Sequence, residues 1–248
     1  MKGTVYLVGA GPGAPDLLTL RAARILARAD IVFHDALVHP DTIALAVHAE
    51  KVAVGKRSGR RSTAQRFINK RLLDAARTHR IVVRLKGGDP MIFGRAGEEI
   101  RFLEGEGVRV EVVPGITAAL AASAELRVPL TARGVARSVT FVTPRVGEGE
   151  QPSRWVAAVL NADTAAIYMA AGELPHVAKS LLEAGLARST PVALVENVSL
   201  PGARIRYTTL DVLSAASLGA PGLVLLGEAY REAAAQAARD VLAASQSA

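Results

Sequence analysis

Short runs of β-branched and other apolar residues alternate along the chain with segments of helical periodicity. In the first half, such runs cover 5–8, 31–33, 52–54, 81–85 and 108–113. Between them, apolar residues recur every three or four positions over 17–29 and 66–76, which predicts helices. Strands separated by helices favour parallel pairing, because a parallel connection needs a crossover. The first half is therefore expected to form an α/β layer.

A second series of strands and helices follows the first. Strands are expected at 139–143, 164–169, 192–196, 205–209 and 223–226. The strand at 205–209 and the one after it could instead be antiparallel, as short connections allow. The turn-rich segment 128–134 separates the two series. We predict an α/β fold of two domains, an N-terminal one over 1–130 and a C-terminal one with a helical tail over 131–248, with the active site in the cleft between them.

Composition excludes several classes of protein. The 248 residues include no cysteine, so no disulfide, thiolate metal site or cysteine nucleophile is available. The five histidines lack metal-ligand spacing, and we expect no metal. No stretch approaches the ~20 apolar residues that cross a bilayer. We expect a cytoplasmic protein without a membrane partner.

The formal charge of +7, from 30 basic and 23 acidic residues, raises the question of a polyanionic partner. Most arginines are spread singly along expected helices, and aromatic residues that would stack on bases make up only 4%. The dense basic cluster consists of Lys56, Arg57, Arg60 and Arg61. This cluster is interpreted as a solvated loop, or as a site for RNA or for a small molecule with several carboxylates. We do not expect nucleic acid.

A glycine-rich loop follows the first expected strand. Residues 9–14, Gly-Ala-Gly-Pro-Gly-Ala, formally match a dinucleotide-binding fingerprint. Pro12 removes a backbone donor and fixes φ, which suits a pyrophosphate poorly. The loop is therefore interpreted either as a nucleotide site or as a strand-to-helix turn that uses glycine for geometry alone.

A second glycine loop, over 84–95, follows the fourth expected strand and is more informative. Its adjacent Gly87 and Gly88 let a ligand lie against bare backbone, and Asp89 adds a negative charge. That charge disfavours a phosphate and favours a cation. The sulfonium of S-adenosylmethionine (SAM) is the common cellular example.

Several motifs occur in one order along the chain. They are Gly9–Gly13 with Leu17–Leu20, Asp35–Val38, Val54–Lys56, Arg84–Arg95 with Glu98-Glu99, Val113–Thr117, Pro129–Thr131, Tyr168-Met169 and Val195–Asn197. In these motifs the sequence resembles the tetrapyrrole methylases over roughly residues 3–230, and Arg84–Arg95 is the most specific part.

The resemblance implies a homodimer of two-domain α/β chains that binds SAM in the interdomain cleft. It implies transfer of two methyl groups to uroporphyrinogen III, giving precorrin-2 on the path to sirohaem or cobalamin. The SAM contacts of the family fall on Pro12, Gly87, Gly88, Asp89, Ile92, Thr117, Ala118 and Met169, with one more, normally glycine, on Val198.

The same resemblance assigns the proton acceptor and donor to Asp35 and Lys56, and substrate binding and proton removal to Arg95, Glu98, Arg133 and Met169. Because every substituent of uroporphyrinogen ends in a carboxylate, arginines there would form charge-assisted hydrogen bonds. Arg95 is expected to clamp substrate, since an arginine pKa usually lies above ~12. Each of these residues also has a simpler interpretation. Asp35 could cap the segment after the second strand, and Lys56 could be a solvated loop residue. Arg95 and Glu98 could form an ordinary surface ion pair, and Met169 could lie in the core.

The sequence departs from the usual family pattern near the proposed site. The positions concerned are Ala14, Ala132, Pro144, Arg145 and Ala170. These changes keep a later corrin-pathway intermediate open as the methyl acceptor. An RNA or protein acceptor, as in relatives with this fold, and a non-catalytic SAM-binding module are further alternatives.

Overall fold

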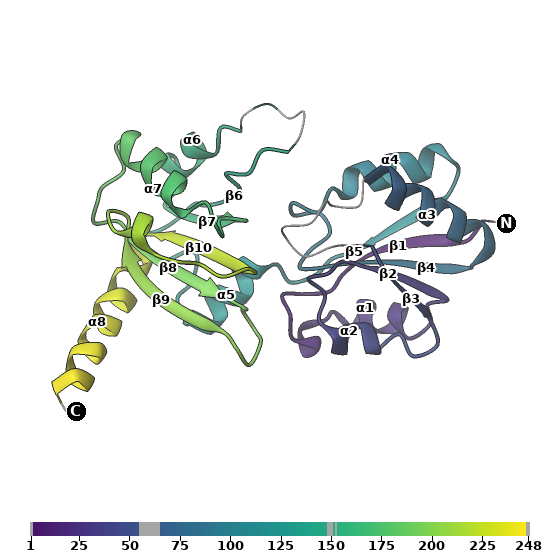
Figure 1. Ribbon diagram of the computed structural model, residues 1–248, viewed down its shortest axis with the longest axis horizontal. Coiled ribbons are helices and arrows are strands. Elements are labelled where there is room, and N and C mark those ends of the chain that lie inside the picture. Colours follow the sequence, from purple (N-terminus) through teal and green to yellow (C-terminus); the bar gives the residue numbers. More distant parts are fainter. Residues whose placement is uncertain (1, 55–64, 148–150, 152, 247–248) are drawn as a thin grey trace. The chain divides into compact units, whose positions relative to one another are not determined.

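The computed structural model describes residues 2–54, 65–147, 151 and 153–246 in two compact units. The units are Met1–Ala118 and Ala119–Ala248, and each is treated separately below. Each contains one five-stranded sheet with helices around it (Figure 1). The predicted α/β fold with two sheets is confirmed.

The first unit holds a fully parallel sheet in the order β3-β2-β4-β1-β5. Its strands are β1 (Thr4–Gly9), β2 (Ile31–His34), β3 (Glu50–Ala53), β4 (Ile81–Lys86) and β5 (Arg109–Val113). All five lie close to the apolar runs of the sequence. Parallel pairing brings the carboxyl ends of all five strands to one edge of the sheet.

Helices cover both faces of this sheet (Figure 1). One face carries α3 (Gln65–Thr78) and α4 (Ala96–Gly105), whose Leu72 and Leu103 are fully buried against Val5 and Leu7 of β1. The other face carries η1 (Pro15–Leu17), α1 (Leu20–Leu26) and α2 (Pro40–Ala44). The helical prediction over 17–29 therefore corresponds to a short 3₁₀ turn and α1. Its break falls at Thr19, whose hydroxyl caps α1 by accepting from Ala22 N.

The boundary between the units differs from the predicted one at 130/131. Helix α5 (Ala118–Leu126) is assigned to the second unit except for its first residue. Two hydrogen bonds explain this: Ala119 N donates to Tyr168 Oη at 3.1 Å, and Ser199 N donates to a Glu125 carboxylate oxygen at 2.9 Å. The turn-rich segment after α5 closes on itself through a bridge between Ala132 and Ala136. It therefore lies inside the second unit, and does not link the two.

The second unit holds a mixed sheet in the order β6-β7-β10-β8-β9. Only β6 and β7 pair in parallel; the pairs β7 with β10, β10 with β8, and β8 with β9 are antiparallel. The alternative in which 205–209 and the strand after it are antiparallel is thus confirmed, because β9 runs antiparallel to β8 and β10 runs antiparallel to both of its neighbours. The strands are β6 (Val139–Val142), β7 (Thr164–Tyr168), β8 (Pro191–Glu196), β9 (Arg204–Thr209) and β10 (Gly222–Gly227).

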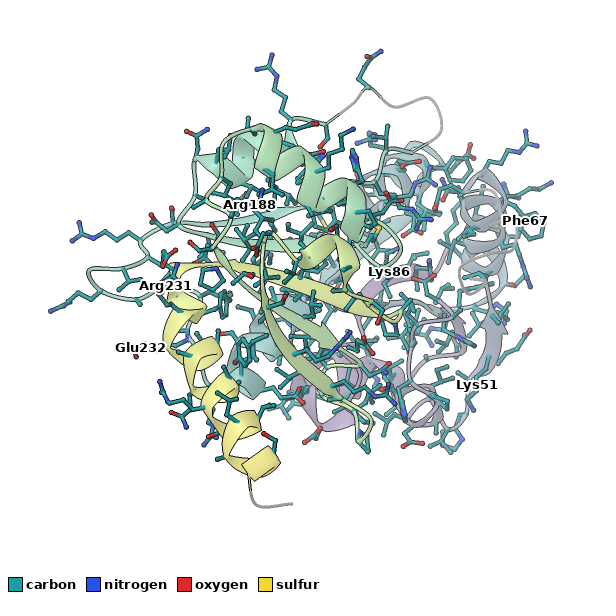
Figure 2. The ribbon with its side chains drawn as sticks, turned by 60° about the vertical axis from the view of Figure 1, so that its left-hand side comes forward. Lys51, Phe67, Lys86, Arg188, Arg231 and Glu232 are labelled. Carbon is teal, nitrogen blue, oxygen red and sulfur yellow. The ribbon has the colours of Figure 1, made fainter. Side chains whose placement is uncertain are left out.

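Helices α6 (Trp155–Leu160) and α7 (Leu174–Glu183) pack on the second sheet, and Trp155, Val177 and Leu181 are buried there. The segment 211–216 forms only a 3₁₀ turn, η2 (Leu213–Ala215). A further turn, η3 (Glu228–Tyr230), leads into the predicted tail helix, α8 (Arg231–Gln246). Figure 2 labels Arg231 and Glu232 where α8 begins. Side chains of α8 are mostly exposed.

Candidate active site

Three loops at the carboxyl edge of the first sheet interlock through bare backbone. Gly11 and Gly88 form a bridge, with N–O distances of 3.2 Å and 2.7 Å. A Cβ on Gly115 would lie 2.3 Å from the carbonyl oxygen of Gly88, and one on Gly9 would lie 2.6 Å from the backbone of Gly115. Only glycine permits this approach. The loops after β1, β4 and β5 are therefore packed directly against one another. The glycines of the first loop are required for this close packing.

Gly87 lacks such a packing reason. A Cβ there would meet its nearest neighbour, Cβ of Leu37, at 3.6 Å, which is ordinary van der Waals contact. Gly88 has a φ of +67°, and its nearest neighbour to a built Cβ is Thr117 Cα at 3.9 Å. Bare backbone with room above it is what a closely bound ligand requires. The loop also lies at a switch point of the fold, because β1 leads to α1 on one face and adjacent β4 leads to α4 on the other.

Asp89 joins two of these loops. Its Oδ1 accepts a hydrogen bond from Met91 N at 2.8 Å, and its Oδ2 accepts one from Gly115 N at 2.9 Å. The sequence suggested that this carboxylate attracts a cation. The structure gives it a second task, which is to hold the loop after β4 against the loop after β5.

The loop after β4 then enters α4 through two strained residues. Phe93 and Arg95 have φ values of 52° and 55°, a left-handed conformation that is uncommon for residues with a side chain. Arg95 lies at the N-terminus of α4 and grips Glu98 with both ends of its fork, Nε to Oε1 at 2.7 Å and Nη2 to Oε2 at 2.8 Å. These hydrogen bonds lower the pKa of Glu98. The side chains of this pair are largely exposed.

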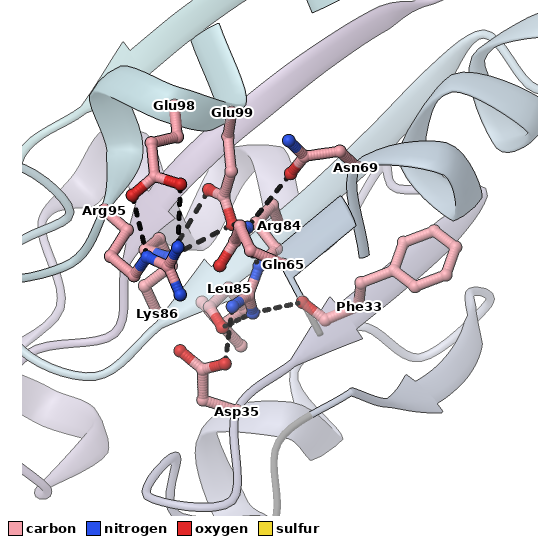
Figure 3. Close-up of polar contacts among 10 residues, drawn as sticks. All are labelled: Phe33, Asp35, Gln65, Asn69, Arg84, Leu85, Lys86, Arg95, Glu98 and Glu99. Carbon is pink, nitrogen blue, oxygen red and sulfur yellow. Dashed lines mark hydrogen bonds and ion pairs between the residues drawn. The ribbon is translucent and has the colours of Figure 1, made fainter. Parts of the chain in front are cut away.

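Behind the loops lies a buried charged cluster, shown in Figure 3. Arg84 and Lys86 alternate with Val83 and Leu85 along β4, so both basic side chains lie on the face that α3 and α4 cover. Glu99 of α4, 0% exposed, accepts from Arg84 Nε at 3.2 Å and from Lys86 Nζ at 3.3 Å. Burial and the nearby Arg84 lower the pKa of Lys86, against the opposing effect of Glu99.

Asp35 is the predicted site residue that this cluster reaches. It follows β2 directly, and its Oδ1 accepts a hydrogen bond from Arg84 Nη2 at 2.5 Å. The capping alternative for Asp35 describes only its backbone, because its carbonyl oxygen accepts from Val38 N at 3.2 Å. Arg84, Lys86 and Glu99 had no role predicted from the sequence. The signal was present as two charged residues at inward positions of a strand whose other residues are apolar.

In the second unit, left-handed residues also follow the strands. Met169, directly after β7, has a φ of 57°, and Asn197 and Ser199, after β8, have φ values of 50° and 66°. Strands β7 and β8 are both antiparallel to β10, so these residues lie at the same edge of the sheet. Met169 is 39% exposed, which argues against its core alternative, whereas Val198 is buried.

The other predicted positions divide between the two units. Pro12 and Ile92 are half-buried in the loops of the first unit, and Thr117 is buried where the loop after β5 enters α5 at Ala118. Arg133 is exposed in the turn between Ala132 and Ala136. Lys56 and the rest of the basic cluster lie outside the described residues. The interdomain cleft stays a prediction.

Among the described residues, no group of three or more His, Asp or Glu side chains is arranged to hold a metal ion. No helix in the same part of the chain is long and apolar enough to span a bilayer.

Comparisons with known proteins agree on one family. The family model of tetrapyrrole (corrin/porphyrin) methylases matches residues 4–214. A curated relative, the uroporphyrinogen-III C-methyltransferase of Pseudomonas aeruginosa, is 44% identical over 240 residues, which are 95% of this chain and 98% of the relative. The siroheme synthase of Psychrobacter sp. is 45% identical over 232 residues, and the chain spans about half of it, 47%.

The fold has a matching solved structure with a bound nucleoside. The crystal structure of uroporphyrin-III C-methyl transferase from Thermus thermophilus, in complex with S-adenosylhomocysteine, matches with a TM-score of 0.82 and 42% sequence identity. The match covers 92% of this chain and 94% of the Thermus chain.

Proposed function

The chain belongs to the tetrapyrrole (corrin/porphyrin) methylase family, and on that premise we propose that it methylates uroporphyrinogen III with SAM as the methyl donor. Two methyl transfers give precorrin-2, the precursor of sirohaem and cobalamin. The observation that carries this proposal is the match to the Pseudomonas aeruginosa enzyme over nearly the full length of both chains. The chain is thus a SAM-dependent methyltransferase.

The loop after β4 is suited to hold SAM. The exposure of Gly87 and the positive φ of Gly88 leave backbone groups accessible to a nucleoside or an amino-acid moiety. Asp89, tied to Gly115, fixes that backbone against the loop after β5. When bound, SAM supplies a methyl group on a positively charged sulfur. We place its other contacts at Pro12, Ile92, Thr117, Ala118, Met169 and Val198, as the family resemblance implies.

Arginines are suited to hold the acidic macrocycle. Arg133 is exposed, and within the described part of the chain its guanidinium has no hydrogen bond or ion pair. Arg95 presents a fork that already binds the Glu98 carboxylate, so a substrate carboxylate competes with Glu98 for the same donors. This competition gives Glu98 a role in positioning Arg95 before substrate arrives.

The reaction requires alignment and one proton acceptor. A pyrrole carbon of the substrate forms a bond to the methyl carbon as the carbon–sulfur bond breaks, and the sulfur keeps that electron pair. The methylated ring is then cationic and must lose a proton. We assign this proton to Asp35, whose side chain is 29% exposed and already held through one oxygen. Holding both reactants in line contributes up to ~7 to 11 kcal/mol in well-aligned systems.

We also propose, on the family resemblance, a homodimer in the cytoplasm. A chain without cysteine needs no oxidising compartment, which supports the location. Size-exclusion chromatography with light scattering tests the oligomer directly, because a homodimer has twice the mass of the chain.

An anaerobic assay with SAM and uroporphyrinogen III tests the activity. We expect release of S-adenosylhomocysteine together with the absorbance of an oxidised dimethylated product. SAM binding without turnover on uroporphyrinogen III would contradict the proposal. A parallel assay with a later corrin intermediate, or RNA retention that is lost in modest salt, would then separate the alternative acceptors.

Two glycine variants test the placement of SAM. Gly87→Ala adds a methyl group that, among the described residues, meets only Cβ of Leu37, at 3.6 Å, so the fold should tolerate it while the ligand should not. We expect an unchanged melting temperature and at least about tenfold weaker binding of S-adenosylhomocysteine, from lost contacts and steric overlap. Gly105→Ala, where no atom of the described part of the chain lies within 4 Å of the new Cβ, is the matched control. Unchanged affinity in Gly87→Ala would place the nucleoside elsewhere.

A further inference from the structure

We propose that Glu99 and Arg84 are positioning residues, which together hold the Asp35 carboxylate where it accepts the proton released after methyl transfer. This inference rests on the proposed function. It assigns a positioning role to two buried residues: Arg84, which contacts Asp35 directly, and Glu99, which acts on Asp35 through Arg84.

Glu99 anchors the arrangement from α4. Its carboxylate is completely buried, and Oε1 accepts from Arg84 Nε at 3.2 Å and from Gln65 Nε2 at 2.9 Å. Lys86 Nζ donates to both of its oxygens at 3.3 Å. A carboxylate with this many donors has little freedom to rotate, so it fixes the guanidinium that it binds.

Arg84 transmits this constraint because its guanidinium is planar and rigid. While Nε binds Glu99, Nη1 donates to the carbonyl oxygens of Phe33 at 3.5 Å and Leu85 at 3.3 Å (Figure 3). The remaining nitrogen, Nη2, reaches Asp35 Oδ1 at 2.5 Å. Guanidinium contacts thus span from α4 to the end of β2. A lysine ammonium, as a point charge, could not hold Glu99 and Asp35 in this fixed geometry.

Asp35 keeps one oxygen for chemistry. Its Oδ1 is bound by Arg84, and its backbone N donates to Leu85 O at 3.3 Å. Among the described residues, no group donates to its Oδ2. A partly exposed carboxylate with one oxygen held and one open is the geometry that a positioned proton acceptor requires.

The cluster is balanced in charge, which explains why it is tolerated in the core. Arg84 and Lys86 of β4 face Glu99 of α4 and Asp35 after β2. His34, the other titratable neighbour on β2, contacts the backbone oxygen of Asp35. A buried charge cluster contributes little net stability compared with apolar packing, so its presence beside the reacting edge favours a positioning role.

A double-mutant cycle tests the inference. The single-turnover rate of methyl transfer is measured at saturating SAM and uroporphyrinogen III for Asp35→Asn, Arg84→Lys, Glu99→Gln and the two pairs that combine Asp35→Asn with each of the others. We expect each single variant to lose at least about tenfold in rate, with affinity for S-adenosylhomocysteine within about twofold of the unmodified chain. Because Arg84 and Glu99 act through Asp35, the paired variants should be no slower than Asp35→Asn alone.

Several outcomes would overturn the inference. One is a multiplicative loss in the paired variants, as for a purely structural role; another is an undiminished rate in Arg84→Lys or in Asp35→Asn. Arg84→Lys retains all charges, so it carries the test if Glu99→Gln does not fold. Glu104→Gln, an exposed charge change on α4, is the control. If instead the unmodified chain releases no S-adenosylhomocysteine with uroporphyrinogen III, the proposed function itself has failed.

Discussion

Nη2 of Arg84 lies 2.5 Å from Oδ1 of Asp35, so a buried residue of β4 is tied to the first residue after the neighbouring strand β2. The ion pair is 3% exposed on the arginine side and 29% exposed on the aspartate side. It therefore connects the core of the first unit to the edge of the sheet where the loops gather. Buried charges in this protein support the part of the chain that we expect to do the chemistry.

Arg133 should discriminate between the two reactants. We expect Arg133→Ala to weaken binding of uroporphyrinogen III by roughly tenfold or more, because one charge-assisted hydrogen bond contributes about 1.5–3 kcal/mol. Affinity for SAM should stay nearly unchanged, since the guanidinium is proposed to face carboxylates. Calorimetric titration with each ligand measures both. Arg137→Ala removes another exposed charge of the same segment and serves as control; equal losses for both ligands would argue against this placement of Arg133.

Asp89→Ala should weaken the binding of SAM and S-adenosylhomocysteine before it affects other properties. The change leaves the N–H groups of Met91 and Gly115 without their acceptor, and the loops after β4 and β5 lose their tie. We expect binding of S-adenosylhomocysteine to weaken by about tenfold, in line with about 1–3 kcal/mol for donors left unpaired. Asp89→Asn keeps one acceptor oxygen, so its affinity for S-adenosylhomocysteine should lie between those of the unmodified chain and Asp89→Ala. Full affinity in Asp89→Ala would show that the tie is dispensable.

Two adjacent carboxylates on α4 should differ sharply in their effect on stability. Glu99→Gln leaves Arg84 and Lys86 buried with less compensating charge, and we expect a loss of about 3–5 kcal/mol in the free energy of unfolding. Glu98→Gln disrupts only a largely exposed pair with Arg95, for which less than about 1 kcal/mol is expected. Urea unfolding at neutral pH compares them. Similar losses in both variants would contradict the assignment of Glu99 to a buried cluster.

Lys86 should make stability depend on pH. Burial is the main reason why its pKa in the folded protein is lowered from the ordinary lysine value of 10.5. Between the folded and the unfolded pKa of Lys86, the unfolded chain therefore binds more protons than the folded one. The free energy of unfolding therefore gains a term that rises with pH across that window, as the cost of burying the ammonium is relieved. We expect Lys86→Met to remove this term. A plot of the free energy of unfolding against pH, measured as pH approaches 10.5 from below, should then be flatter for the variant, and an unchanged slope would be incompatible with a perturbed lysine.

Much of the first unit could be predicted from local pattern. Apolar runs of β-branched residues overlap all five strands of its sheet, and the central strands β1 and β4 show the longest runs because a strand buried on both faces needs an almost continuous apolar stretch. Short helices were harder: α2, from Pro40 to Ala44, is too short to show a period. In the second half, the pattern located the strands, but their direction depended on pairing between distant segments.

The glycine loops illustrate the division between sequence and tertiary structure. Sequence alone identified Gly9, Gly87, Gly88 and the family to which they point, because these positions lie in local motifs whose spacing is visible in one dimension. The tertiary structure decided which glycines pack and which stay open. A Cβ on Gly9 would lie 2.6 Å from the backbone of Gly115, which follows β5, whereas a Cβ on Gly87 would meet no described residue closer than 3.6 Å.

Burial of charge was likewise decided by the tertiary structure. Arg84 and Glu99 are ordinary polar residues in the sequence, and they become a fixed pair only when α4 packs on β4 and excludes water from both. Local residue types determine what a segment tends to form. The contacts that give a charge its partner come from segments joined by the sheet, and their distances follow from strand order and register, which no local pattern contains.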